Sequence, residues 1–191
     1  IYTGFGRTGR MFACDHEGVV PDIMCLGKGM TGGFPMSACV GKPGVMSRWP
    51  ASAGEAIHTS TFLGNPLGCA MGQAALSVYQ KRNLPERAAR MGRYFMDRLR
   101  RRIGERECVG DIRGRGLMIG VELVKSRKSK TPAPDLCGRV IVKSLRRGLI
   151  LLGGGTHRNV ISLSPPLTVE RAEIDFCVDI LSDVLQAKSF D

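Results

Sequence analysis

The apolar positions in the first part of the chain fall into short runs between glycine-rich turns. Residues 23–26 form one such run, which Pro21-Asp22 precedes and Gly27-Lys28-Gly29 follows. A short apolar run that is bounded by turn residues is typical of a buried strand. A second apolar stretch, Ser37–Val40, follows the next glycine-rich turn. The pattern therefore predicts that Lys28 lies on a loop at the end of a buried strand.

Helical periodicity begins near Asn65. This residue is a suitable cap and Pro66 suits the first helical position, so we expect a helix that continues to about Gln80. A second helix is predicted after Asn83, because its apolar residues recur every three or four positions along a highly cationic segment. Its apolar stripe consists of Leu84, Ala88, Met91, Phe95 and Leu99.

The pattern changes again beyond Gly110. Two apolar segments, Leu117–Val124 and Val160–Leu163, indicate strands. Helices are expected near Asp135–Arg146 and over about Glu170–Gln186. Because strands and helices in this order indicate a small α/β domain, the sequence predicts a boundary near residue 82 and two units, 1–82 and 83–191.

Composition adds that the chain is globular. At 191 residues and 43% hydrophobic it has enough apolar surface for a core. It contains no membrane-length apolar run, and its first residues lack the charged-then-apolar layout of a signal peptide. The seven cysteines form no Cys-x-x-Cys pair, and no histidine lies at metal-ligand spacing. We therefore expect a soluble cytoplasmic protein with reduced thiols and no metal site. Cys25 lacks a histidine partner and is expected to be a small buried hydrophobe.

The formal charge of +11 is concentrated in residues 98–106, 125–130 and 143–147. These clusters are not interleaved with aromatic residues, so solvated helix faces and loops are favoured over a nucleic-acid-binding surface. A compensating acidic surface in a part of the protein upstream of Ile1 is a further possibility.

The segment Gly4–Gly9 has the spacing of a dinucleotide-binding glycine motif. That motif follows a strand and opens a helix, whereas here no strand precedes it and Pro21 interrupts any helix. A turn-rich loop is therefore predicted.

Lys28 is isolated among small and apolar residues. The neutral form of a lysine amine attacks aldehydes to make imines, and a poorly solvated pocket favours that form. The flanking glycines leave room for a flat cofactor. Residue spacing alone still favours an ordinary lysine on a surface loop.

Five blocks in order resemble class III aminotransferases, the pyridoxal-phosphate-dependent family that includes ornithine, acetylornithine and 4-aminobutyrate aminotransferases. The blocks are Thr3–Gly9, Pro21–Gly33, Ser60–Pro66, Arg113–Met118 and Pro165–Leu167. The resemblance extends over nearly the whole chain. It implies an α/β PLP-dependent transferase of fold type I, with the carboxyl-terminal part of the large cofactor-binding domain in 1–82. Residues 83–191 would form the connecting helix and the small carboxyl-terminal domain.

By the same resemblance, Lys28 would hold pyridoxal 5'-phosphate as a Schiff base and move the proton between substrate and cofactor. Ser60 and Thr61 would contact the cofactor, with the Thr61 hydroxyl on its phosphate. In the family that threonine comes from the neighbouring subunit, which implies a homodimer or larger homo-oligomer. The substrates would be a small amino donor and a 2-oxo acid acceptor.

The chain departs from the family pattern at three places. The aspartate that pairs with the pyridine nitrogen would lie just upstream of Ile1, so the isolated 191 residues are expected not to transaminate. Tyr2 stands where many relatives carry a glutamine beside the cofactor ring oxygen. Ser162 stands where many amino-acid-specific members carry a carboxylate-binding arginine. Either Arg158 replaces that arginine or the amino substrate has no α-carboxylate there.

Alternatives stay open at this point. A racemase, decarboxylase or aminomutase of the same fold would use the same lysine. A non-catalytic basic binding module, or a structural fragment that packs against a partner, would use none of this chemistry.

Overall fold

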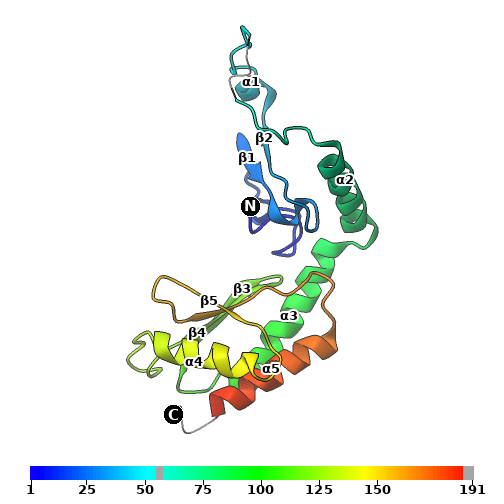
Figure 1. Ribbon diagram of the computed structural model, residues 1–191. Helices are drawn as coiled ribbons and strands as arrows, with labels where there is room; N and C mark the ends of the chain where they lie inside the picture. The colour runs from blue at the N-terminus through cyan, green and yellow to red at the C-terminus, as the bar shows by residue number, and fades with distance from the viewer. Residues whose placement is uncertain (55–57, 187–191) are drawn as a thin grey trace.

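The computed structural model describes residues 1–54 and 58–186. Loops, a two-stranded ladder and helix α2 form its amino-terminal part, and a four-stranded sheet with three helices forms its carboxyl-terminal part (Figure 1). Helix α3, Leu84–Ile103, runs from the end of the first part along the sheet of the second. The chain therefore passes from the first part to the second at the start of α3.

The amino-terminal part begins with turns and a short 3₁₀ helix, Ala13–His16. Strand β1, Ile23–Leu26, pairs antiparallel with β2, Ala38–Gly41. A 3₁₀ helix, Lys28–Met30, follows β1 directly, and a short helix α1, Pro43–Met46, follows β2. The strand predicted before Lys28 and the turn-rich loop predicted over Gly4–Gly9 are thus confirmed.

The prediction that β1 is buried was wrong. Its residues alternate between exposed and half-exposed, and Ile23 is 51% exposed. Cys25, predicted to be a small buried hydrophobe, is likewise exposed. The physical reason is that β1 has only β2 beside it within the described part of the chain, and two strands alone cannot enclose apolar side chains.

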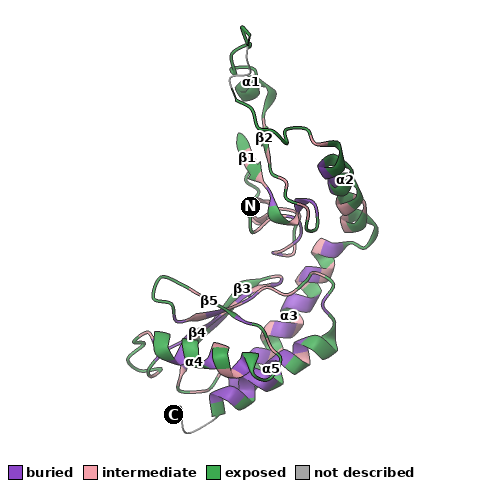
Figure 2. Cartoon of the chain, viewed as in Figure 1, coloured by how far each residue is buried: buried purple, intermediate pink, exposed green. Residues whose placement is uncertain are grey.

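Helix α2, Pro66–Lys81, has the predicted start. The Asn65 side chain accepts a hydrogen bond from the Gly68 amide at 3.0 Å, which satisfies one of the free donors of the first turn. Most of its outer face is exposed, and only Gly68 and Gly72 are buried (Figure 2).

The carboxyl-terminal sheet has the order β3-β4-β6-β5, and all of its neighbouring strands are antiparallel. Its strands are β3, Val109–Arg115, β4, Met118–Leu123, β5, Leu152–Gly154, and β6, Val160–Leu163. Buried and half-buried residues alternate along β4 and β6, so one face of the sheet points into the core. Helices α3, α4, Pro134–Leu145, and α5, Arg171–Gln186, cover that face.

The apolar stripe predicted for α3 is confirmed. Its five residues are at most 5% exposed, and four of them belong to the core that the helices share with the sheet. Two of the arginines of α3 also pair with acids on α5. Arg98 Nε lies 2.7 Å from Asp175 and Arg102 Nη2 lies 3.0 Å from Asp179. The basic run over α3 thus belongs to a helix face.

The apolar pattern of the sequence did not predict two of the strands, β3 and β5. In β3 only Val109 and Ile112 are buried, because the other positions are polar, charged or glycine. Strand β5 consists of one leucine and two glycines. Such segments form strands because their neighbours supply the hydrogen bonds.

No helix in the described ranges is long and apolar enough to cross a bilayer. All seven cysteines are free thiols. Burial raises the pKa of the Cys177 thiol to about 12, so this residue behaves as a core hydrophobe.

Gly92 on α3 provides a test of the packing between α3 and the β3–β4 turn. A methyl group at this position would overlap the backbone carbonyl of Gly116. We expect Gly92→Ala to lower the free energy of unfolding by about 1–3 kcal/mol in urea titrations. The matched change Gly138→Ala, on the exposed side of α4 with no atom within 4 Å, should raise it by about 0.5–1 kcal/mol. Equal effects at both sites would contradict the close approach.

Candidate active site

Lys28 follows β1 in a left-handed backbone conformation, with φ 50°. Its amine lies 5.7 Å from the centre of the Tyr2 ring, over the ring face. Lys28 is exposed, so the poorly solvated pocket expected from the sequence is not formed by the described residues.

Tyr2 connects Lys28 with the carboxyl-terminal sheet. Its hydroxyl group donates a hydrogen bond to Ser164 Oγ at 2.6 Å. Ser164 follows directly after β6, so the phenol spans from the lysine to the end of that strand. The structure therefore brings together Tyr2 and Lys28, two of the residues singled out in the sequence, and adds Ser164.

Helix α2 contacts the loop that contains Lys28. Tyr79 donates a hydrogen bond from its hydroxyl group to the Gly29 carbonyl at 2.6 Å. The Tyr79 ring lies against Phe5, 5.9 Å between ring centres, and Phe5 is only 3% exposed. Sequence reasoning missed Tyr79, because a tyrosine late in an amphipathic helix carries no local sign of a contact fifty positions away.

Arg7 fastens the glycine-rich loop to the carboxyl-terminal part. Its Nη1 donates hydrogen bonds to the carbonyls of Leu117 at 3.2 Å and Pro165 at 2.5 Å. Its own carbonyl accepts from the Leu117 amide at 2.9 Å. Burial lowers the pKa of the Arg7 guanidinium, and the nearby Tyr2 and Tyr79 act in the opposite direction. Arg7 was also missed, since its role depends on two carbonyls more than a hundred positions away.

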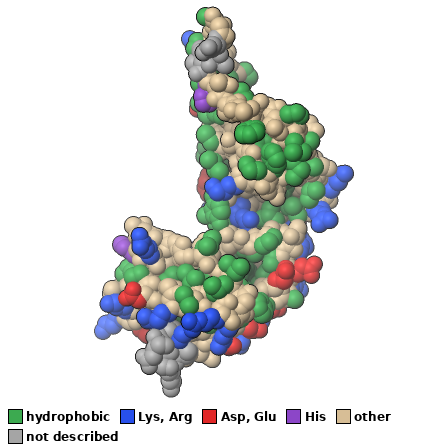
Figure 3. Space-filling model, viewed as in Figure 1, with side chains coloured by type: hydrophobic (Ala, Val, Ile, Leu, Met, Phe, Trp, Pro, Cys, Tyr) green, Lys and Arg blue, Asp and Glu red, His purple; other side chains and the backbone are tan. Residues whose placement is uncertain are grey.

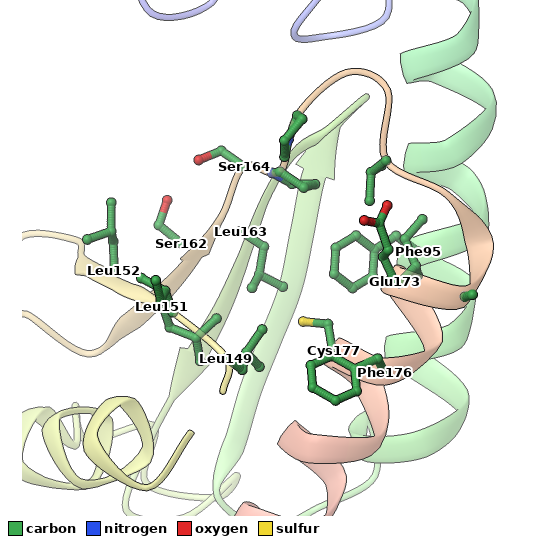
Figure 4. Close-up of a pocket in the computed structure, with 16 residues that line it drawn as sticks. Phe95, Leu149, Leu151, Leu152, Ser162, Leu163, Ser164, Glu173, Phe176 and Cys177 are labelled. Carbon is green, nitrogen blue, oxygen red and sulfur yellow. The ribbon is translucent and has the colours of Figure 1, made fainter. Parts of the chain in front are cut away.

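Ser162 lies on the same side of the sheet as Ser164. It is paired directly with Leu152 across β5 and β6, and directly paired residues share a face. In Figure 4 the side chains of Ser162, Ser164 and Leu152 point to one side of the strands. Those of Leu151 and Leu163 point to the other side, toward Cys177. Ser162 thus lies on the face of the sheet that Tyr2 contacts.

An apolar pocket of about 720 Å³ opens between the β5–β6 hairpin and α5 (Figure 4). Phe95, Leu163 and Cys177 are among its lining residues, and Glu173 is the charged group at its edge. Leu151 and Leu163 line it from the core side of the sheet, and Ser162 and Ser164 belong to its rim on the other face.

The remaining predicted residues are not joined to Lys28. Ser60 and Thr61 lie in the exposed loop before α2, and Arg158 lies in the exposed turn between β5 and β6. Within residues 1–54 and 58–186, no side-chain hydrogen bond or ion pair links any of these three residues to Lys28 or Tyr2.

A sequence model of the class III aminotransferases matches residues 1–185. The chain belongs to the class III aminotransferase family. The 4-aminobutyrate aminotransferase of Mycobacterium leprae is 40% identical over 189 residues, which cover 97% of this chain and 40% of the relative. The leucine/methionine racemase of Thermococcus litoralis is 39% identical over 181 residues, 95% of this chain and 40% of the relative.

Solved structures agree with the family. An aminotransferase from Bacillus anthracis superposes with a TM-score of 0.90 at 36% identity, over 97% of this chain and 43% of that one. The expected α/β fold, PLP-dependent transferase fold type I, is thereby confirmed. This class III aminotransferase chain spans about 40% of the length of the curated relatives it matches.

Unfolding measurements test whether the hydrogen bonds from Arg7 to the carbonyls of Leu117 and Pro165 stabilise the protein. We expect Arg7→Gln to lower the free energy of unfolding by about 1.5–3 kcal/mol, because charge-assisted hydrogen bonds to two carbonyls are lost. Arg10→Gln is the matched control, since among the residues that the structure describes Arg10 makes a single, exposed side-chain hydrogen bond, 3.3 Å long, to the Asp15 carbonyl. It should change stability by less than about 0.5 kcal/mol. A loss as large in the control would show that the Arg7 contacts do not stabilise this junction.

Proposed function

We propose that the complete encoded protein containing these residues is a pyridoxal-phosphate-dependent aminotransferase in which Lys28 carries the cofactor. The observation that supports this most directly is a lysine amine at the end of β1, over the ring of Tyr2, within a chain matched by the family from residue 1 to 185. The names of the two relatives given above describe reactions on amino compounds.

The surroundings of Lys28 suit such a cofactor. The amine makes no hydrogen bond or ion pair within the described ranges, so it is available for covalent attachment. Gly32 and Gly33 have no atom within 4 Å of where a side chain would begin, which leaves open space after the Lys28 turn. Pyridoxal phosphate, when bound, supplies an aldehyde for this amine and a ring that accepts electrons.

Each of the candidate residues of this chain would then have a separate role. Lys28 binds the aldehyde and afterwards holds or moves a proton at its Nζ. Tyr2, fixed at its hydroxyl by Ser164, borders the amine and limits where it points. Ser60 and Thr61 would contact the cofactor, with the Thr61 hydroxyl group on its phosphate.

The phosphate site would be completed by a second copy of the chain. Phe62, Leu63 and Leu67, next to Thr61, are 76%, 70% and 61% exposed. Apolar side chains gather on the surface around α2 in Figure 3. An exposed apolar surface of this kind supports an interface, and we propose a homodimer or larger homo-oligomer.

The substrates are proposed to be a small amino donor and a 2-oxo acid acceptor. Ser162 cannot make a two-point ion pair with a carboxylate, and the face around it also carries the apolar Leu152. Arg158 lies on the neighbouring turn and is the available substitute. We also propose that 1–82 belongs to the large domain, that 83–191 forms the connecting helix and small domain, and that the protein is cytoplasmic.

Racemisation is the second candidate, because a relative at 39% identity is named a leucine/methionine racemase. The same lysine serves both reactions. Chiral analysis of the amino acid after incubation without an oxo acid acceptor separates them, since only a racemase inverts the substrate under that condition.

Replacement of Lys28 tests the proposed function. In the complete protein loaded with pyridoxal phosphate, Lys28→Ala should abolish both the visible absorbance of the linked cofactor and transamination. The matched change Lys42→Ala removes another lysine after a strand, one that is already paired with Asp22 at 2.7 Å, and should leave both intact. The isolated 191 residues should show no turnover. Unchanged absorbance in Lys28→Ala would contradict the proposal.

Donor preference tests the role of Ser162. We expect Ser162→Arg to raise kcat/KM for an α-amino acid relative to an amine without a carboxylate by about tenfold or more, because a guanidinium–carboxylate pair forms. If Arg158 already binds the carboxylate, the single variant Arg158→Ala lowers the ratio of kcat/KM for the α-amino acid to kcat/KM for the amine. An unchanged ratio in both variants would place carboxylate recognition elsewhere.

A further inference from the structure

The backbone at Lys28 is in a conformation that a lysine rarely adopts. Its φ of 50° lies in the left-handed region, where the side chain crowds the backbone at a cost of about 1 kcal/mol or more. Lys28 can remain there only if surrounding contacts hold it. The direction of its amine therefore depends on whatever restrains the turn.

Tyr79 supplies one such restraint from α2, in addition to the backbone hydrogen bonds from the amides of Met30 and Gly32 to the carbonyls of Gly27 and Gly29. Its hydroxyl group donates to the carbonyl of Gly29, the residue directly after Lys28, at 2.6 Å. A methyl group on Gly29 would lie 3.2 Å from Phe5 Cβ and 3.3 Å from Tyr79 Oη, so the turn is seated closely against both aromatic residues. No other side-chain hydrogen bond to the backbone of Lys28 or Gly29 is present in the described part of the chain.

The position of Tyr79 is itself well defined. Its ring contacts Phe5, which is 3% exposed and also packs edge-to-face on Phe12 at 5.6 Å. Burial raises the pKa of the Tyr79 hydroxyl, and Arg7 opposes this. The hydroxyl thus keeps its proton and remains a donor at neutral pH.

We propose that Tyr79 is a positioning residue, whose hydroxyl group holds the Lys28 turn in the left-handed conformation that directs the amine over Tyr2. The inference rests on the proposed function, in which Lys28 carries the cofactor. Tyr79 contacts the carbonyl after Lys28 and acts only through that turn. Its loss therefore slows steps that Lys28 performs and leaves donor binding unchanged.

Tyr79→Phe in the complete protein tests this inference, because it keeps the ring against Phe5 and removes only the donor. We expect kcat to fall about 5- to 10-fold, the effect of one lost hydrogen bond, while KM for the amino donor stays within about twofold. The rate at which borohydride fixes pyridoxal phosphate to Lys28 should fall by a similar factor. The thermal midpoint should change by only a few degrees, about as for other single hydrogen bonds.

Tyr94→Phe is the matched control. It also removes a phenolic hydroxyl group, one that donates to Asp175 on α5 at 2.8 Å, in a partly buried position beside the core of the carboxyl-terminal part. It should leave kcat, KM and Lys28 fixation unchanged.

Three outcomes would overturn the inference. They are wild-type kcat and fixation rates in Tyr79→Phe, equal losses in Tyr79→Phe and Tyr94→Phe, and a raised KM with unchanged kcat. Failure of the proposed function looks different. In that case the wild-type protein itself shows no visible absorbance that depends on Lys28, and both proposals fall.

Discussion

The close contact between the glycine-rich segment 4–9 and the carboxyl-terminal part is the constraint on which the other contacts depend. A side chain on Gly116 would lie 2.5 Å from the Thr8 carbonyl carbon, so the two backbones touch. Arg7 closes the contact with its bonds to the carbonyls of Leu117 and Pro165. Because the segment is fixed there, Tyr2 reaches Ser164 on one side and Phe5 reaches Tyr79 on the other.

Lys28 is thus restrained by segments that are far apart in the chain. The amine meets the ring of Tyr2 from the first residues, and the backbone after it is bonded to Tyr79 of α2. Tyr2 in turn is bonded to Ser164 at the end of β6. A shift of the sheet against the loops would move Tyr2, and a shift of α2 would move the lysine itself. This arrangement couples the packing of two parts of the molecule to the position of one amine.

Much of the fold could be predicted from local signals. Helices α2 and α3 have a cap or a regular apolar stripe, and β6 is a short apolar run at its predicted place. Strands β3 and β5 lack such a pattern, because hydrogen bonds from neighbouring strands define them. Lys28 could be singled out as a candidate because its neighbours in sequence are unusual and resemble a family block. Tyr79, Arg7 and Ser164 could not, since their contacts are long-range, and the enclosure expected around β1 and Lys28 requires surfaces that these residues alone do not provide.

The proposed function requires that pyridoxal phosphate is attached covalently to the amine of Lys28. The most direct measurement is borohydride reduction of the complete protein loaded with pyridoxal phosphate, followed by peptide mapping by mass spectrometry. The account predicts that the added pyridoxyl mass falls on the peptide that contains Lys28 and on no other lysine. Attachment to another lysine, such as Lys42, with Lys28 unmodified would contradict it.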